Sequence, residues 1–141
     1  MSEKIRDVAL DTIDAPADAP EVGSSHELML ATARAAAERK GSKIVALHVA
    51  EVSFIADYFT IVTGFSRVQV RAIAQAIEAE VEEKLGRQPL RKEGLSEGTW
   101  ALLDYGEAIV HVLLPEEREF YNLEAFWGHA EQVELPEELF E

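Results

Sequence analysis

Hydrophobic and polar residues follow one another along the middle of the chain in patterns that predict both strands and helices. Residues 43–49 (KIVALHV) and 58–63 (YFTIVT) are short runs rich in β-branched and aromatic side chains, which favour strands. Two further strands are expected at 100–103 and 108–114, on either side of the sequence DYGE at 104–107. A short polar, glycine-containing segment between two apolar runs predicts a tight hairpin.

Two helices are predicted to begin at capping boxes, in which a serine is followed three residues later by Glu or Gln. The first box begins at Ser24, and Gly41 is expected to end the helix that follows. The second box begins at Ser66, and Gly86 ends the helix. One apolar stripe at helical spacing runs along this second helix and consists of Val70, Ile73, Ala74, Ile77, Val81 and Leu85.

A third, amphipathic helix is expected to open at Pro115 and to continue through Phe120, Leu123, Phe126 and Trp127. The expected order is therefore helix, two strands, helix, two strands, helix. The strand at 108–114 is apolar on both alternating sets apart from His111, which predicts helices on both faces of the sheet. The fold class is an α/β sandwich with a mixed sheet.

The chain has 141 residues, which is the length of one domain, and its formal net charge is −14. Residues 1–24 carry a net charge of −4 and show no sustained period, so we expect a disordered acidic extension there. Residues 25–130 are expected to form the single domain, and 131–141 an acidic C-terminal tail. The segment 25–115 is nearly neutral, at −2, whereas 116–141 carries −8.

This charge distribution argues against nucleic-acid binding as the main function, because phosphate recognition normally requires a basic face. The one basic cluster comprises Lys84, Arg87, Arg91 and Lys92. The chain has no cysteine, which excludes disulfides, thiolate metal sites and thiol catalysis. It has no apolar run of membrane-spanning length, and its first residues resemble no signal or transit peptide, so we expect a cytoplasmic protein with no membrane contact.

The strongest enzymatic interpretation is a nucleotidyltransferase. Residues 63–66 (TGFS) join a strand to a helix, where backbone amides can face a phosphate. Such enzymes then need two carboxylates one residue apart on a strand to hold Mg²⁺. The acidic triplets at 78–82 lie mid-helix, where alternate side chains diverge, and the residue two places after Asp104 is Gly106. We therefore expect a capped strand-to-helix turn without catalytic carboxylates.

The histidines and serines add no chemistry of their own. The four histidines lack metal-ligand spacing, so no metal site is predicted. The serines lack the context of a hydrolase nucleophile. Trp100 and Tyr105 flank a strand beside a turn, where an aromatic side chain can project and anchor a protein interface. The pattern favours a binding module, and whether Phe126 and Trp127 belong to the core or to the surface stays open.

Three blocks resemble one known family. Residues 57–69 resemble the D-x-x-x-I-x-T-G-x-S-x-x-Q block of the Iojap-like family, which contains the bacterial ribosomal silencing factors. Residues 100–112 resemble its W-x-x-x-D-Y-G-D-x-V-V-H-V block, and 118–127 its R-x-F-Y-x-L-E-x-L-W ending. Glu107 stands where the family usually has Asp, and Phe126 where it usually has Leu.

The resemblance implies a nucleotidyltransferase-like fold without the catalytic carboxylates, and a protein that is not an enzyme and needs no cofactor. It implies binding to the large ribosomal subunit through ribosomal protein L14, which blocks joining of the small subunit and represses translation under nutrient limitation. The matching block makes Trp100, Leu103, Asp104 and Tyr105 the expected contact residues. Whether the free protein is a homodimer is left open.

Two alternatives make different predictions. A nucleotidyltransferase would turn over nucleoside triphosphate with Mg²⁺. A nucleic-acid-binding module would bind naked RNA with an affinity that falls steeply with salt.

Overall fold

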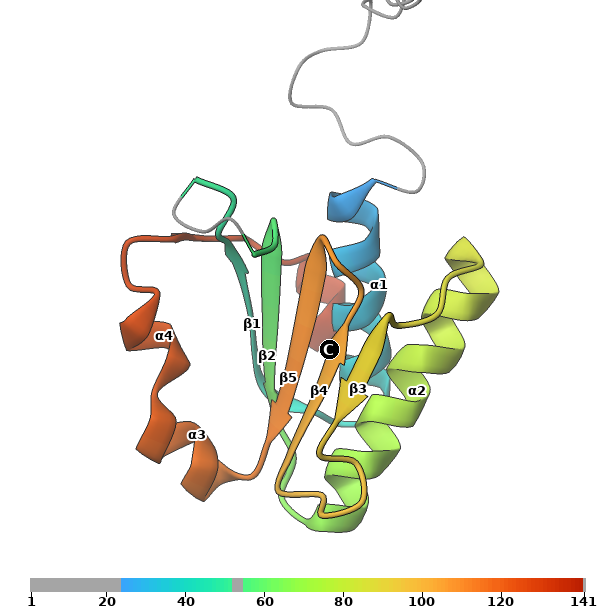
Figure 1. The fold of residues 1–141 in the computed structure, drawn as a ribbon, viewed down its shortest axis with the longest axis vertical. Coiled ribbons are helices and arrows are strands. Elements are labelled where there is room, and N and C mark those ends of the chain that lie inside the picture. The colour runs from blue at the N-terminus through green and yellow to red at the C-terminus, as the bar shows by residue number, and fades with distance from the viewer. Residues whose placement is uncertain (1–23, 52–54, 141) are drawn as a thin grey trace, which may run out of the picture.

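The computed structural model describes residues 24–51 and 55–140, which form a six-stranded mixed sheet with helices on both sides (Figure 1). The strands are β1 (Ser42–His48), β2 (Tyr58–Thr63), β3 (Arg91–Glu93), β4 (Trp100–Asp104), β5 (Ala108–Leu113) and β6 (Glu131–Gln132). Their order across the sheet is β3-β4-β5-β2-β1-β6. Strands β2 and β5 pair in parallel, and the other neighbours pair antiparallel.

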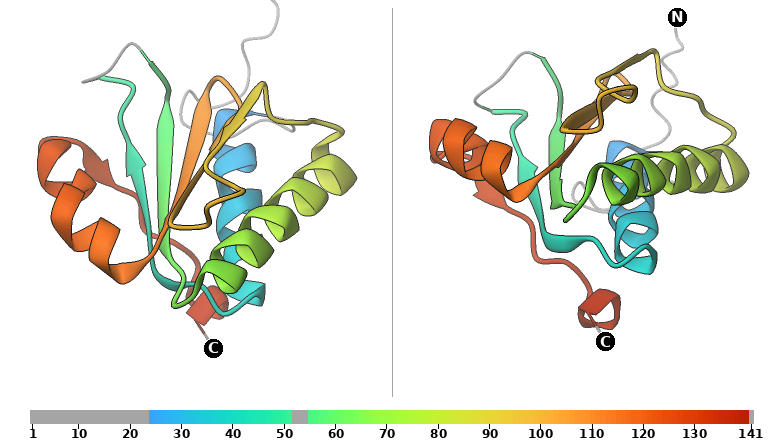
Figure 2. Two further views of the ribbon diagram at one scale, coloured as in Figure 1. Left: turned by 60° about the horizontal axis from the view of Figure 1, so that its bottom comes forward. Right: turned by 90° about the horizontal axis from the view of Figure 1, so that it is seen from below.

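The helices form a layer on each face of the sheet, as the sequence predicts. They are α1 (Ser25–Glu38), α2 (Arg67–Leu85), α3 (Pro115–Tyr121), α4 (Leu123–Phe126) and the 3-10 helix η1 (Glu137–Phe140). The views in Figure 2 place α1 and α2 on one face and α3 and α4 on the other. Within the described ranges, no helix is both long and apolar enough to cross a membrane.

In both predicted capping boxes, the serine N-cap is confirmed. The Ser24 hydroxyl accepts a hydrogen bond from the backbone N–H of Glu27 at 3.2 Å and caps α1. The Ser66 hydroxyl does the same for the N–H of Gln69 at 3.0 Å and caps α2. Helix α2 ends at Gly86, whose φ of 65° lies in the left-handed region that glycine adopts without strain.

The third predicted helix is not continuous, because Asn122 interrupts it. Asn122 has a φ of 45°, and its side chain accepts a hydrogen bond from the N–H of Ala125 at 3.4 Å, which starts the short α4. Asn tolerates this backbone conformation better than most residues. On the two sides of the break, the side chains of Phe120 and Phe126 are 80% and 76% exposed, so neither belongs to the core.

Two further differences concern the ends of the sheet. No strand was expected between Gly86 and residue 100, but this segment contains β3, which pairs with β4 as an edge strand. We expected a solvated acidic tail over 131–141, whereas β6 pairs with β1, and Leu135 and Leu139 pack against the core on the α1 side. Apolar residues spaced among the acids explain this packing. The extension expected at 1–24 lies outside the described residues, apart from Ser24.

The sheet separates two apolar clusters. The larger one lies between the sheet and helices α1 and α2. The smaller one lies on the opposite face, where Trp100, Leu102, Leu123 and Trp127 are only partly buried. Strand β4 therefore has one face in the main core and one face close to solvent. The candidate site lies on the face close to solvent.

Candidate partner-binding site

Strand β4 divides the four expected contact residues between the two faces of the sheet. Side chains alternate along a strand, so Leu103 and Tyr105 point toward α2, while Trp100 and Asp104 point the other way. Leu103 and Tyr105 have an exposed fraction of 0%. The expectation that Tyr105 projects into solvent is therefore wrong, and neither side chain is available to a partner in this conformation.

Tyr105 is a core residue held at the end of the hairpin. Its hydroxyl is buried and has no hydrogen-bond partner among the described residues, and burial raises the pKa of its phenol. Arg87 donates to the backbone carbonyl of Tyr105 at 2.9 Å and to both carboxylate oxygens of Glu107, at 2.6 and 2.9 Å. This pairing lowers the pKa of the Glu107 carboxyl and raises that of Arg87. The turn is thus tied to the end of α2.

Asp104 stabilises the same turn. Its Oδ1 accepts a hydrogen bond from the backbone N–H of Gly106 at 2.8 Å. Its Oδ2 lies 3.4 Å from Nη2 of Arg91 on the neighbouring strand. Asp104 is half-buried, so one part of its carboxylate orders the hairpin while another part faces solvent near Arg91.

Trp100 is half-buried and is held in place from two sides. Its Nε1 donates a hydrogen bond to Nδ1 of His111 at 3.1 Å. Its ring lies against Tyr121 of α3, with 4.8 Å between centroids and 49° between the planes. Contacts on both sides restrict the indole to one orientation, which removes an entropic cost that a mobile anchor would incur on binding.

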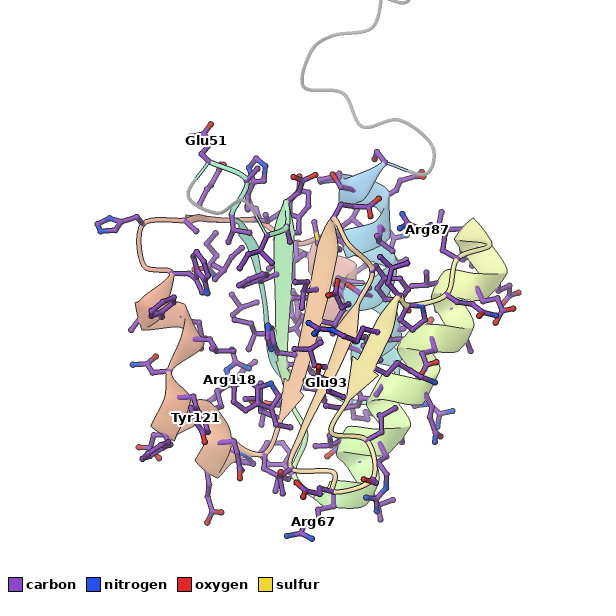
Figure 3. The ribbon with its side chains drawn as sticks, in the orientation of Figure 1. Glu51, Arg67, Arg87, Glu93, Arg118 and Tyr121 are labelled. Carbon is purple, nitrogen blue, oxygen red and sulfur yellow. The ribbon has the colours of Figure 1, made fainter. Side chains whose placement is uncertain are left out.

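A surface pocket of about 480 Å³ opens beside this indole, and we call it the Trp100 pocket. It lies between the β3–β4 segment and α3, and Figure 3 labels Glu93 on the first and Tyr121 on the second. Its lining residues are Glu93, Gly94, Glu97, Thr99, Trp100, Leu102, Glu117 and Tyr121. The lining thus combines two aromatic rings with three carboxylates and contains no basic side chain.

The β3–β4 loop is shaped by glycine and by a contact from α2. Gly94 has a φ of 79°, and a Cβ at this position would lie 1.9 Å from the carbonyl oxygen of Trp100. The N–H of Gly98 donates to the carbonyl of Gly94 at 2.9 Å, and Arg71 donates to the carbonyl of Ser96 at 3.2 Å. The loop therefore runs directly over the backbone of Trp100.

The glutamates of the pocket are missing from the sequence-based interpretation. Glu93 and Glu97 lie between the predicted helix that ends at Gly86 and the predicted strand at 100–103, and Glu117 lies in the first turn of a helix. The glycines at 94 and 98 were the available signal for a close approach of this loop to Trp100.

The strand-to-helix turn at residues 63–66 has a structural role. Gln69 accepts a hydrogen bond from the N–H of Phe65 and donates to the carbonyls of Arg39 and Lys40, which joins the ends of the two long helices. On the other side, Arg118 donates to Thr63 at 3.0 Å and lies between α3 and the sheet (Figure 3).

Arg118 also pairs with both carboxylate oxygens of Glu124, at 2.7 and 3.3 Å, so its guanidinium is already engaged. Across residues 24–51 and 55–140, no three His, Asp or Glu side chains come together in a group that could hold a metal ion.

Comparison with known proteins places this geometry in a family. A family model described as "Ribosomal silencing factor during starvation" matches residues 22–141. A ribosomal silencing factor RsfS from Halalkalibacterium halodurans is 40% identical over 112 residues, which are 79% of this chain and 95% of that protein. Another from Bacillus subtilis is 41% identical over 103 residues, covering 73% and 86% of the two chains.

A plant protein and two crystal structures extend the comparison. The chloroplastic protein Iojap of Arabidopsis thaliana is 36% identical over 130 residues, 92% of this chain and 52% of that protein. A crystal structure from Chromobacterium violaceum has a TM-score of 0.71 at 31% identity and covers 77% and 87% of the chains. One from Bacillus halodurans has a TM-score of 0.69 at 36% identity and covers 78% and 99%.

Proposed function

This chain belongs to the ribosomal silencing factor family, and from that membership we propose that it binds the large ribosomal subunit and blocks joining of the small subunit. The proposed contact is ribosomal protein L14, and the proposed outcome is repression of translation when nutrients are scarce. The bound protein acts by steric exclusion, which requires a surface but no catalytic group.

The observation that carries the proposal is the placement of Trp100. The indole lines a surface pocket, and its hydrogen bond to His111 and its contact with Tyr121 fix its orientation. Pre-oriented aromatic side chains in pockets are typical anchors of protein interfaces. Asp104 lies on the same face of β4, at the other end of the strand, and adds a negative charge to that face.

Burial divides the roles within the expected contact set. We propose that Trp100 and Asp104 contact the partner, while Leu103 and Tyr105 hold β4 against α2 from the core side. The net charge of −14 supports a basic protein as the partner, because opposite charges speed and orient association. The same charge disfavours contact with ribosomal RNA, whose phosphates repel it.

The test is a subunit-joining experiment. Purified large subunits are mixed with the protein, small subunits are added, and the mixture is sedimented. We expect the peak of joined ribosomes to fall as the protein concentration rises. An unchanged peak at saturating protein would overturn the proposed function.

Trp100→Ala tests the anchor in the same experiment. Loss of an aromatic anchor costs about 2 kcal/mol, which is roughly a thirtyfold loss of affinity. The control is Phe140→Ala, which removes a 59% exposed aromatic from η1, next to α1 on the opposite side of the sheet. Circular dichroism and urea unfolding confirm that both variants fold. Wild-type affinity of folded Trp100→Ala would remove Trp100 from the interface.

A further inference from the structure

The Trp100 pocket has a composition suited to one kind of side chain. We propose that it receives an arginine of the partner protein, with the guanidinium against the rings of Trp100 and Tyr121 and paired with Glu117. This assignment rests on the proposed function, because it specifies the chemistry of the partner at the same site. It adds Glu117, Glu97 and Glu93 as specificity-determining residues.

The charge of the lining selects a cation. The pocket contains the carboxylates of Glu93, Glu97 and Glu117, and none of its lining residues is Lys or Arg. Glu93 lies 3.3 Å from Nη1 of Arg91, but both side chains are more than half exposed, so this pair is weak and can rearrange. An anionic ligand such as an RNA phosphate would be repelled by all three carboxylates.

One oxygen of these carboxylates is buried without a hydrogen-bond partner. The Oε1 atom of Glu117 is buried and has no hydrogen-bond partner among the described residues. Buried polar atoms are almost always hydrogen-bonded in native proteins, because an unpaired one loses its hydration without compensation. Glu117 as a whole is only partly buried, so a rotation of its side chain would bring this oxygen to a donor in the pocket, which would supply the missing bond. This unpaired oxygen is an observation about the ligand that is independent of the overall charge.

The aromatic wall favours arginine over lysine. Trp100 and Tyr121 lie with their centroids 4.8 Å apart and line the same pocket. A guanidinium is planar, stacks on aromatic faces and presents a fork of N–H donors that matches a carboxylate. A lysine ammonium is a compact, strongly hydrated charge without a planar face. The same pocket therefore discriminates between the two basic side chains.

The direct test uses a small probe without the ribosome. N-acetyl-arginine amide is titrated into ¹⁵N-labelled protein up to about 50 mM, because single-side-chain contacts bind weakly. The indole N–H signal of Trp100 is followed, and it is assigned by comparison with a Trp100→Phe variant. We expect this signal to shift with the arginine probe, and to shift at least threefold less with N-acetyl-lysine amide and with the uncharged citrulline analogue.

Matched variants locate the effect. Glu117→Gln should remove the shift, whereas Glu116→Gln should retain it, since Glu116 makes the same charge change in the same turn of α3 but does not line the pocket. In the large-subunit binding assay, Glu117→Gln is expected to lose about tenfold in affinity and Glu116→Gln less than twofold. Urea unfolding confirms that both variants are folded.

The outcomes separate this inference from the proposed function. An arginine probe that leaves the Trp100 signal unchanged, or shifts it equally in Glu117→Gln, overturns the arginine pocket even if the protein binds large subunits. A single-stranded RNA oligonucleotide that shifts the same signal more than arginine also overturns it. A specific shift in a protein that leaves subunit joining unaffected would support the pocket and reject the ribosomal role.

Discussion

The indole of Trp100 donates a hydrogen bond to His111 across the β4–β5 pair, with 3.1 Å between Nε1 and Nδ1. In the strand register Leu102 lies opposite His111, so Trp100 is its diagonal neighbour on the same face of the sheet. Nδ1 can accept this bond only when it carries no proton. His111 is therefore the buried, neutral support of the residue that anchors the proposed interface.

This arrangement makes stability depend on pH. Burial lowers the pKa of His111 to about 4, below the value of 6.5 for an unfolded histidine. Between these values the unfolded chain binds a proton that the folded chain excludes, so the stability contributed by His111 is present above pH 6.5 and falls as the pH falls toward 4. We expect a loss of about 2 kcal/mol in unfolding free energy between pH 7 and pH 5 from this residue.

The measurement is urea unfolding at both pH values for wild type and for His111→Gln, whose amide oxygen can accept the bond from Trp100. Every other group is the same in both proteins, so the difference between the two pH dependences isolates His111. Glu107 does not contribute to the change between pH 7 and pH 5. Arg87 lowers the pKa of its carboxyl from the ordinary value of 4.5, so its stabilising charge is lost only below this range. An equal pH dependence of the unfolding free energy in wild type and variant would contradict the role assigned to His111.

Tyr105→Phe separates a core role from a contact role at the hairpin. The Tyr105 hydroxyl is buried and has no partner among the described residues, so its removal relieves a desolvation penalty. We expect the variant to be as stable as wild type or more stable by about 1 kcal/mol. Large-subunit affinity should change less than twofold. A loss of binding by a folded Tyr105→Phe protein would show that the hydroxyl reaches the partner.

Gly94→Ala tests whether the loop over Trp100 shapes the pocket. The new Cβ would meet the Trp100 carbonyl at 1.9 Å, and the φ of 79° adds backbone strain. We expect a loss of about 2–4 kcal/mol in unfolding free energy and weaker large-subunit binding. The control is Gly86→Ala, at a φ of 65° but with no atom within 4 Å of the new Cβ, which should cost about 1 kcal/mol and leave binding unchanged. Similar effects of the two substitutions on binding would exclude the specific role of Gly94.

Truncation after Ala130 tests the unexpected packing of the C-terminal segment. It removes β6, which pairs with β1, and the partly buried Leu135 and Leu139. We expect the unfolding free energy to fall by about 2 kcal/mol or more. Replacement of Glu134 and Glu137 by Gln should have little effect, because it keeps the apolar contacts while it removes acidic charge. Unchanged stability of the truncated chain would mean that residues 131–140 contribute no packing energy.

Local sequence patterns determined most of the elements of this fold. The strands at 58–63 and the helix capped by Ser66 and ended by Gly86 follow from side-chain period and from residues that satisfy helix ends. These features depend on neighbours within a few positions, so they can be read without the fold. The hairpin around residues 104–107 is a local feature of the same kind.

The tertiary structure decided which of these residues reach the surface. Alternation along β4 could be read from the sequence, but which set of side chains faces α2 depends on how that helix, which ends fifteen residues upstream, packs on the sheet. This packing buries Leu103 and Tyr105. Strands β3 and β6 are short and polar, and they exist because longer partners offer free backbone groups.

The Trp100 pocket depends most on contacts that are distant in sequence. Its walls come from the loop after β3, from β4 and from α3, and Glu117 lies seventeen positions beyond Trp100. Local propensity carries no information about which of nine acidic residues after position 115 approaches that indole. The approach follows from the β4–β5 pairing, the chain reversal at Pro115 and the packing of α3 against β5, which together place α3 beside Trp100.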